Sequence, residues 1–314
     1  MKNDLLFLDP IFKEMVWGGE RLEEFHYDLP SDRVGECWGI SAHPQGDCII
    51  KEGRYQGKSL SQLWKECPFL FGGYDSEEYP LLVKLIYAKH DLSIQVHPDD
   101  CYARRHEGCQ GKTECWYVMD CKEGTRLIIG HNAESKRELY EMIDERRWED
   151  FLREIPVQRG DFIQIDPGTV HTIKGGMLIC ETQQSSNITY RLYDYDRLSE
   201  GSPRQLHLQQ SKEIITVPAK EVDQSVRNTM DLPVNRMNEM VSNRYYTVWK
   251  LEVDGAFSFE QEYPFMNVSV LEGEGQINGR QIRKGDHFII PAEYGRVELQ
   301  GRMLLMTSKA NLCS

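Results

Sequence analysis

Glycine and proline residues recur about every ten residues between residues 18 and 176, and this spacing constrains the fold more than any other feature. Such turn residues leave only short β-rich segments between them, which is typical of a sandwich or a barrel. The sequence therefore predicts a mainly β fold, with turns around Gly18-Gly19, Gly35, Gly46, Gly53, Gly57, Gly72-Gly73, Pro98, Gly111, Gly130, Gly160, Pro167-Gly168 and Gly175-Gly176.

Helices are expected in two segments that interrupt the β pattern. The first is SLSQLWKECPFLF at residues 59–71. The second, at residues 133–155, carries an approximately helical stripe of apolar residues and is read as an insertion into the first β unit. The stripe consists of Leu139, Met142, Ile143, Trp148 and Leu152.

The chain is expected to contain two β units. Residues 209–240 are polar and charge-rich, so residues 1–225 form one unit, 226–239 a connector and 240–314 a second unit. GDFIQIDPGTVH in the first unit is weakly repeated by GDHFIIPAEYGRV in the second, which lacks the final histidine. The C-terminal unit is therefore expected to be degenerate and to hold no metal.

Composition excludes several classes of protein. The 314-residue chain is 40% apolar, but no run of about 18 apolar residues is available to cross a bilayer. The formal net charge of −13 argues against nucleic-acid binding. Nine cysteines without a CxxC pair indicate reduced thiols, and the N-terminus lacks the apolar core of a secretory signal. We expect a cytoplasmic protein without nucleic-acid or membrane partners, either a monomer or a weak dimer.

The stretch LSIQVHPDD at residues 92–100 places two polar side chains on one face of a strand. Gln95 and His97 are two residues apart and point to the same side, whereas Ile94 and Val96 point to the other. Glu114 in GKTECWYV and His171 in DPGTVH complete a set of nitrogen and oxygen donors typical of a mixed metal site. Each residue alone is equally explained as a turn or core residue, so the prediction depends on their combination.

The glutamate is expected to face an apolar interior. In a strand, Glu114, Trp116 and Val118 share one face, while Thr113, Cys115 and Tyr117 share the other. A carboxylate buried among apolar groups needs a counter-charge, which a divalent cation supplies.

Four motifs, in the order LSIQVHPDD, GKTECWYV, GDFIQIDPGTVH and QQSSNITYRLYDYDR, strongly resemble those of the type I phosphomannose isomerases in their short bacterial form. These are zinc-dependent mannose-6-phosphate isomerases of the cupin superfamily. The resemblance runs from VWGG at 16–19 to PRQLHL at 203–208 and fades in about the last 90 residues. It implies two cupin-like jelly-roll β-barrels, a catalytic one and a degenerate one, and a sugar phosphate as substrate.

The resemblance also implies roles for individual residues. One zinc ion would be held by Gln95, His97, Glu114 and His171. Arg191 falls on the family's active-site arginine, and Lys112 and Glu181 fall on basic and acidic catalytic positions. Trp17 falls on a tryptophan that lines the pocket, where Lys112 and Arg191 would also contact substrate. Asn187 departs from the aspartate of many relatives, which removes a charge near Arg191.

Zinc would stabilise the oxyanion that forms when a proton moves between C1 and C2 of an aldose. Glu181, Lys112 and a zinc-bound water are all suited to transfer that proton, and the sequence does not choose among them. Another metal-dependent cupin enzyme, such as an iron dioxygenase, is one alternative, but Gln95 replaces the first histidine of an H-x-H pair. A non-enzymatic sugar-binding or regulatory cupin is the other, and the presence of both Lys112 and Arg191 argues against it.

Overall fold

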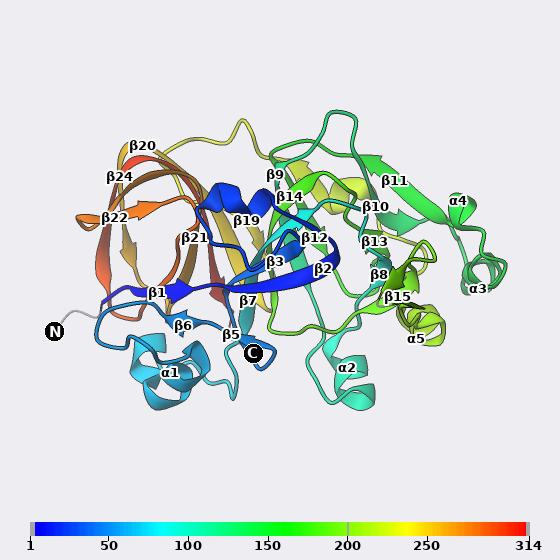
Figure 1. Ribbon diagram of the computed structural model, residues 1–314, viewed down its shortest axis with the longest axis horizontal. Helices are drawn as coiled ribbons and strands as arrows, with labels where there is room; N and C mark the ends of the chain where they lie inside the picture. The colour runs from blue at the N-terminus through cyan, green and yellow to red at the C-terminus, as the bar shows by residue number, and fades with distance from the viewer. Residues whose placement is uncertain (1–3, 200, 312–314) are drawn as a thin grey trace. The chain divides into compact units, whose positions relative to one another are not determined.

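A computed structural model describes residues 4–199 and 201–311, which fold mainly as β-strands (Figure 1). The chain forms two compact units. Unit 1 comprises the described parts of Met1–Lys13, Glu20–Leu85 and Asp231–Ser314, and unit 2 comprises Glu14–Gly19 and the described parts of Ile86–Met230. None of the helices in the described residues has the length and apolar character needed to span a bilayer.

The compact units divide the chain differently from the expected boundaries at 225 and 240. Most of the chain before residue 86 joins the C-terminal segment instead of the segment that follows it. The physical reason is strand pairing, because Leu6 and Phe7 lie opposite Ile289 and Phe288 in an antiparallel ladder. The N-terminal strand therefore completes the sheet of the C-terminal unit.

Unit 1 is built on one large antiparallel sheet. Its strands follow the order β19 (Asn238–Ser242), β20 (Tyr246–Gln261), β24 (Gly295–Ala310), β21 (Met266–Ile277), β23 (His287–Ile290), β1 (Leu6–Asp9) and β6 (Ile49–Ile50), with β22 (Arg280–Arg283) paired to β21. One face buries an apolar cluster that includes Phe7, Leu251, Val268 and Phe288. Gly301 lies opposite Gly255 on one side and Gly275 on the other, and a Cβ there would sit 2.6 Å from the carbonyl oxygen of Glu274. Glycine is thus required where these strands approach closely.

Unit 2 contains two antiparallel arrays of strands. The first has the order β18 (Val226–Asn228), β12 (Asp161–Ile165), β9 (Glu114–Asp120) and β14 (Met177–Gln184). The second has the order β11 (Leu152–Pro156), β10 (Arg126–His131), β13 (His171–Thr172), β8 (Ile94–Val96) and β15 (Tyr190–Tyr193). The described sheets run between edge strands, so the expected jelly-roll layers are present but the sheets do not close into barrels.

Alternation along the strands of unit 2 separates two apolar clusters. Leu127 and Ile129 of β10 pack with Trp116 of β9 in a cluster shared by both arrays. Ile128, between them, packs in a second cluster on the opposite face. Helices cover that second face, namely α3 (Lys136–Asp144), α4 (Trp148–Phe151) and α5 (Leu208–Ile214) (Figure 1). The helical insertion therefore covers one face of the second array and leaves the other face for the interior.

The other helices and strands of the described residues complete the two units. The helices are η1 (Arg21–Phe25), α1 (Leu60–Glu66), η2 (Pro68–Phe71), α2 (Asp100–His106) and η3 (Val222–Gln224). The strands are β2 (Ile11–Gly19), β3 (Val34–Ile40), β4 (Ala42–His43), β5 (Gly46–Asp47), β7 (Leu81–Ala88), β16 (Leu198–Ser199) and β17 (Ser202–Pro203).

The helices predicted from sequence are confirmed in part. α1 and η2 together occupy the expected segment 59–71. The expected helix over 133–155 is wrong at its end, because residues from Leu152 onward form β11, which pairs with β10. The segment 226–239, expected to be a connector, contains β18, which pairs with β12, and the first residues of β19, which begins at Asn238. All described cysteines are free thiols, as predicted.

The buried His287 of unit 1 makes the stability of the chain depend on pH. Ser269 and Tyr27 contact its two ring nitrogens at 2.7 and 2.8 Å, and burial lowers the pKa of His287 to about 3. An unfolded histidine titrates near 6.5, so the unfolded chain binds the proton more readily as the pH falls below that value. Stability is then lost progressively between about pH 6.5 and pH 3.

We predict that protonation of His287 in the unfolded chain lowers the free energy of unfolding by about 2 kcal/mol at pH 5 relative to pH 7. Chemical denaturation of wild type and His287→Gln at both pH values measures the effect. The difference in free energy of unfolding between the two proteins should narrow by that amount at pH 5. An unchanged difference would show that His287 titrates normally.

Candidate metal centre

Gln95 reaches the interior of unit 2 because its neighbours in β8 face the helices. Ile94 and Val96 pack in the cluster beneath α3 and α4, and strand alternation turns Gln95 to the opposite face. His97 follows directly and is buried. The division of side chains between the two faces of LSIQVH that the sequence predicts is therefore confirmed.

The two aspartates that end this stretch organise the next part of the site. Asp99 caps α2, accepting a hydrogen bond from the backbone N–H of Tyr102 at 2.8 Å. Asp100 is buried and accepts from the backbone N–H of Gly111 at 2.9 Å. The Lys112 N–H donates to the carbonyl oxygen of Pro98 at 3.0 Å. These bonds hold the segment that leads into Glu114 against the turn that follows His97.

Glu114 begins β9 and points into the apolar interior. Trp116 and Val118, two and four residues later, belong to the cluster shared by both arrays, as the sequence predicts. In the adjacent strand β14, Gln183 lies opposite Glu114 and Glu181 lies opposite Trp116. Directly opposed residues share a face, so both side chains belong to the face that carries Glu114.

His171 is placed by a turn and by its strand neighbours. Gly168, with φ of 81°, donates its N–H to the carbonyl oxygen of His97 at 2.9 Å. His171 then pairs with Gln95 on one side and Ile129 on the other. Its Nδ1 lies 2.8 Å from the carbonyl oxygen of Thr169, a contact that requires a proton on Nδ1. The lone pair of Nε2 is consequently directed into the site.

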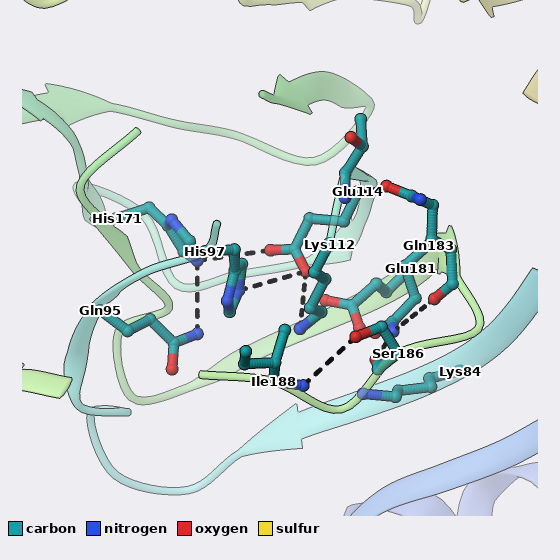
Figure 2. A network of polar contacts seen from close by, with 12 residues as sticks. Lys84, Gln95, His97, Lys112, Glu114, His171, Glu181, Gln183, Ser186 and Ile188 are labelled. Carbon is teal, nitrogen blue, oxygen red and sulfur yellow. Dashed lines mark hydrogen bonds and ion pairs between the residues drawn. The ribbon is translucent and has the colours of Figure 1, made fainter. Parts of the chain in front are cut away.

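Three side chains converge on one small volume (Figure 2). His97 Nε2 lies 3.6 Å from Glu114 Oε2, and His171 Nε2 lies 3.4 Å from Glu114 Oε1. The donor atoms of the three residues all lie within 4.8 Å of one another. Lys112 Nζ lies 2.8 Å from Glu114 Oε2 as an ion pair.

Burial and charge keep these groups in the protonation states that a metal requires. Burial, followed by the charge of Lys112, lowers the pKa of His97 to about 3, and burial also lowers the pKa of His171. Burial alone would raise the pKa of Glu114, but the ammonium of Lys112 holds it well below its usual value. Near neutral pH the site therefore offers two neutral imidazoles and one carboxylate.

Within the described residues, His97 and Glu114 lack the hydrogen bonds that buried polar groups normally make. Both ring nitrogens of His97 have no hydrogen-bond partner among the described residues. Neither oxygen of Glu114 accepts a hydrogen bond of good geometry, although Lys112 is in ion-pair range. Buried polar atoms without hydrogen-bond partners cost free energy of folding. Two imidazoles and a carboxylate at this spacing fit a divalent cation, which would satisfy them together.

Gln95, the fourth expected ligand, lies beside the cluster but presents its amide nitrogen. Gln95 Nε2 is 3.3 Å from His171 Nε2, so it donates toward the lone pair that a metal would take. Rotation of the amide by 180° about its terminal bond would present the oxygen instead. The structure thus brings Gln95 next to the other three candidate ligands without placing its oxygen among them.

The other predicted site residues lie in unit 2 as well. Glu181 is buried and accepts a hydrogen bond from Trp116 Nε1 at 2.9 Å. Arg191 is half-buried on β15 directly opposite Gln95, so its side chain shares the face of Gln95 and His171. Trp17 is buried in the apolar cluster with Trp116.

Asn187, which departs from the aspartate of many relatives, has an exposed side chain.

The sequence patterns also contain two features of the site region that are not among the predicted site residues. Gln183 was not considered, although it follows Glu181 by two residues and alternation alone would have put it on the same face. The capping role of Asp99 was also missed, although an aspartate before a short polar helix is a common helix start.

Several known proteins are similar to this chain. Residues 5–124 match the family described as phosphomannose isomerase type I, catalytic domain, and residues 236–310 match mannose-6-phosphate isomerase, cupin domain. Mannose-6-phosphate isomerase ManA of Bacillus subtilis (strain 168) is 44% identical over 309 residues, covering 96% of this chain and 97% of that protein. The mannose-6-phosphate isomerase of Streptococcus mutans serotype c is 43% identical over 316 residues, covering 98% and 99%.

Solved structures give the same likeness. A crystal structure of the mannose 6-phosphate isomerase from Bacillus subtilis has a TM-score of 0.88 at 41% identity, covering 98% of this chain and 100% of the other. A zinc-bound mannose 6-phosphate isomerase has a TM-score of 0.76 at 13% identity, covering 99% and 100%, which is a likeness of fold.

Removing one imidazole should abolish tight metal binding. We predict that His171→Ala lowers zinc affinity by at least about 100-fold, because the cluster loses one of its three converging donors. His90→Ala, at an exposed histidine of the same unit, should leave affinity unchanged. Competition with a chromogenic chelator measures both. Wild-type affinity in His171→Ala would exclude this cluster as the metal site.

Proposed function

The chain belongs to the type I phosphomannose isomerases, and from this we propose that its metal centre binds one zinc ion and interconverts mannose 6-phosphate and fructose 6-phosphate. The observation that carries the proposal is the buried cluster of His97, Glu114 and His171, whose donor atoms lie within 4.8 Å of one another. Among the described residues, the ring nitrogens of His97 and the carboxylate oxygens of Glu114 have no hydrogen-bond partner. A family whose members isomerise this sugar phosphate accounts for the cluster and for the basic residues around it.

Zinc is the metal that the donor set favours. His97, Glu114 and His171 would hold it, and the amide oxygen of Gln95 would join them after rotation of its terminal bond. When bound, zinc supplies a Lewis-acidic charge that stabilises an oxyanion on the substrate without redox chemistry. The neutral imidazoles and the ionised carboxylate need no loss of protons to accept it at neutral pH.

Proton transfer between C1 and C2 requires a group that removes a proton and returns it. Lys112, paired with Glu114, and Glu181, which accepts a hydrogen bond from Trp116, are buried ionisable side chains of the site that are not candidate ligands. Trp116 fixes one oxygen of Glu181, which limits the directions in which that carboxylate can act. Lys112 is engaged with Glu114, so its ammonium also helps to balance the charge of the metal ligand. Both remain candidates for the transfer, together with a water at the metal.

Arg191 is proposed to meet the negative charge of the substrate. Its position opposite Gln95 places it on the face of the metal cluster. Burial, and next the charge of Arg204, lower the pKa of Arg191, which indicates a second cation nearby. A chain with a net charge of −13 needs such a local reversal to bind a dianionic sugar phosphate. Trp17 is proposed as an apolar wall of the substrate site.

We also propose a cellular location, partners and an oligomeric state for the enzyme. We place it in the cytoplasm, where a phosphorylated sugar is retained, and we assign it a sugar phosphate as its partner. No nucleic-acid or membrane partner is proposed, and the oligomeric state is taken to be a monomer or a weak dimer. The residues proposed to be catalytic lie in unit 2. The C-terminal segment is proposed to hold no metal, because GDHFIIPAEYGRV lacks the histidine that ends GDFIQIDPGTVH.

Turnover tests the proposal directly. The zinc-loaded protein should convert mannose 6-phosphate to fructose 6-phosphate, detected by a coupled assay, and chelation should remove the activity reversibly. Circular dichroism should stay close to that of the loaded protein, because both units have apolar cores of their own. A fully zinc-loaded protein that binds the sugar phosphate without turning it over would instead be a binding protein.

Arg191→Ala separates two roles for this arginine. If Arg191 stabilises the developing enediolate, kcat should fall by roughly 10²–10³, whereas a residue that only grips phosphate would raise KM. We expect the loss in kcat, because the side chain shares the face of the metal cluster. Arg191→Lys keeps the charge without the planar fork, and exposed Arg105→Ala is the control. Wild-type kinetics in Arg191→Ala would remove it from the mechanism.

A further inference from the structure

Gln183 is a fully buried polar residue near the metal cluster. None of the interactions described above gives Gln183 a role. Its exposed fraction is 0%, and it lies on β14 directly opposite Glu114. Opposed residues of an antiparallel pair have Cβ atoms about 5 Å apart and share a face of the sheet. Figure 2 places Gln183 beside Glu114 and Glu181.

The amide of Gln183 is held in one orientation by its nitrogen. Nε2 donates to the carbonyl oxygen of Gln184 at 2.9 Å and also to the carbonyl oxygen of Ser186. Both partners are acceptors. If the amide were turned by 180°, its own oxygen would lie against these two carbonyl oxygens, and no hydrogen bond could form. The network therefore fixes which end of the amide is the donor, and the oxygen cannot exchange places with it.

The amide oxygen of Gln183 is left without a partner. Oε1 has no hydrogen-bond partner among the described residues, although both donor positions of the same amide are used. A buried acceptor without a donor costs about 1–3 kcal/mol. An orphaned acceptor, locked in place at a binding site, is suited to receive a donor that arrives with the ligand.

The neighbouring Gln184 gives the contrast. Its Oε1 accepts from the backbone N–H of Thr113 at 2.9 Å, and its Nε2 donates to Asp100 at 3.0 Å. Strand alternation turns it away from the face that carries Glu114. Gln184 is thus a satisfied structural amide, whereas Gln183 combines the same side chain with an unused acceptor on the sheet face that carries Glu114.

We propose that Gln183 Oε1 accepts a hydrogen bond from a hydroxyl group of the sugar phosphate and thereby helps to select the substrate. This inference rests on the proposed function, because it needs a polyhydroxylated ligand at the metal cluster. The hydroxyls on C3 and C4 take no part in the proton transfer between C1 and C2 and are free in both the pyranose and the open-chain form of the sugar, so the proposal commits to one of them. A substrate that lacks this hydroxyl leaves Gln183 Oε1 buried and unpaired, so the site should favour sugars that carry it.

Kinetics with substrate analogues test the proposal. For wild type, we expect kcat/KM to be about 10–100-fold lower for either the 3-deoxy or the 4-deoxy analogue than for mannose 6-phosphate. In Gln183→Met, which has a similar volume but no acceptor, the same ratio should shrink to within about threefold. The ratio compares two substrates in one preparation, so a partly inactive or unfolded sample does not alter it.

Gln184→Met is the matched control. It removes the hydrogen bonds to Thr113 and Asp100 and should lower the melting temperature, but its discrimination between mannose 6-phosphate and the deoxy analogue should match that of wild type. Full wild-type discrimination in Gln183→Met would overturn the proposal and would mean that water, not the sugar, satisfies the oxygen. Equal loss of discrimination in both variants would also overturn it.

A failure of the proposed function gives a different result. Wild-type protein loaded with zinc would then show no turnover of mannose 6-phosphate, and calorimetry would replace kinetics. Weaker binding of mannose 6-phosphate to Gln183→Met than to wild type and Gln184→Met would still support the contact. Equal binding by all three proteins, or none by any, would overturn it.

Discussion

The site depends on one buried carboxylate. Glu114 is 0% exposed, and its charge is balanced by the ammonium of Lys112 and surrounded by two neutral imidazoles. A carboxylate in this position is costly unless it is paired and coordinated. The protein keeps it ionised while withholding ordinary hydrogen bonds from its oxygens. A divalent cation satisfies the carboxylate and both imidazoles at once, and this requirement links the fold to the chemistry.

The rest of unit 2 serves to place these groups. Helices cover one face of the second array, which leaves Gln95 and His97 on the interior face, while the Pro98–Asp100 turn fixes the segment that carries Lys112. The candidate ligands lie on or directly after different strands, and strand register aligns Arg191, Gln95 and His171 across three adjacent strands. Positions set by strand pairing are less mobile than positions in loops, which suits catalysis that depends on preorganised charge.

Much of this arrangement follows from local patterns in the sequence. Period-two alternation is enough to place Gln95 with His97 and Glu114 with Trp116, and the family resemblance is confirmed over nearly the whole chain. The failures have physical causes. Leu152 and Ile155 fit both a helical and a strand pattern, and only pairing with β10 decides for the strand. The unit division and the position of Gln183 opposite Glu114 arise from long-range strand pairing, which a local pattern does not encode. The orphaned oxygen of Gln183 follows from the two bonds that its amide nitrogen donates to nearby carbonyl oxygens, and these require the folded turn.

Anomalous diffraction from crystals grown with zinc tests the central claim most directly. We expect one strong peak in unit 2, about 2.0–2.2 Å from His97, His171 and Glu114, with the amide of Gln95 turned so that its oxygen faces the ion. We also expect that Lys112 stays beside Glu114. A peak elsewhere, or an intact cluster that remains metal-free at saturating zinc, would contradict the claim that Glu114 is buried to hold a metal.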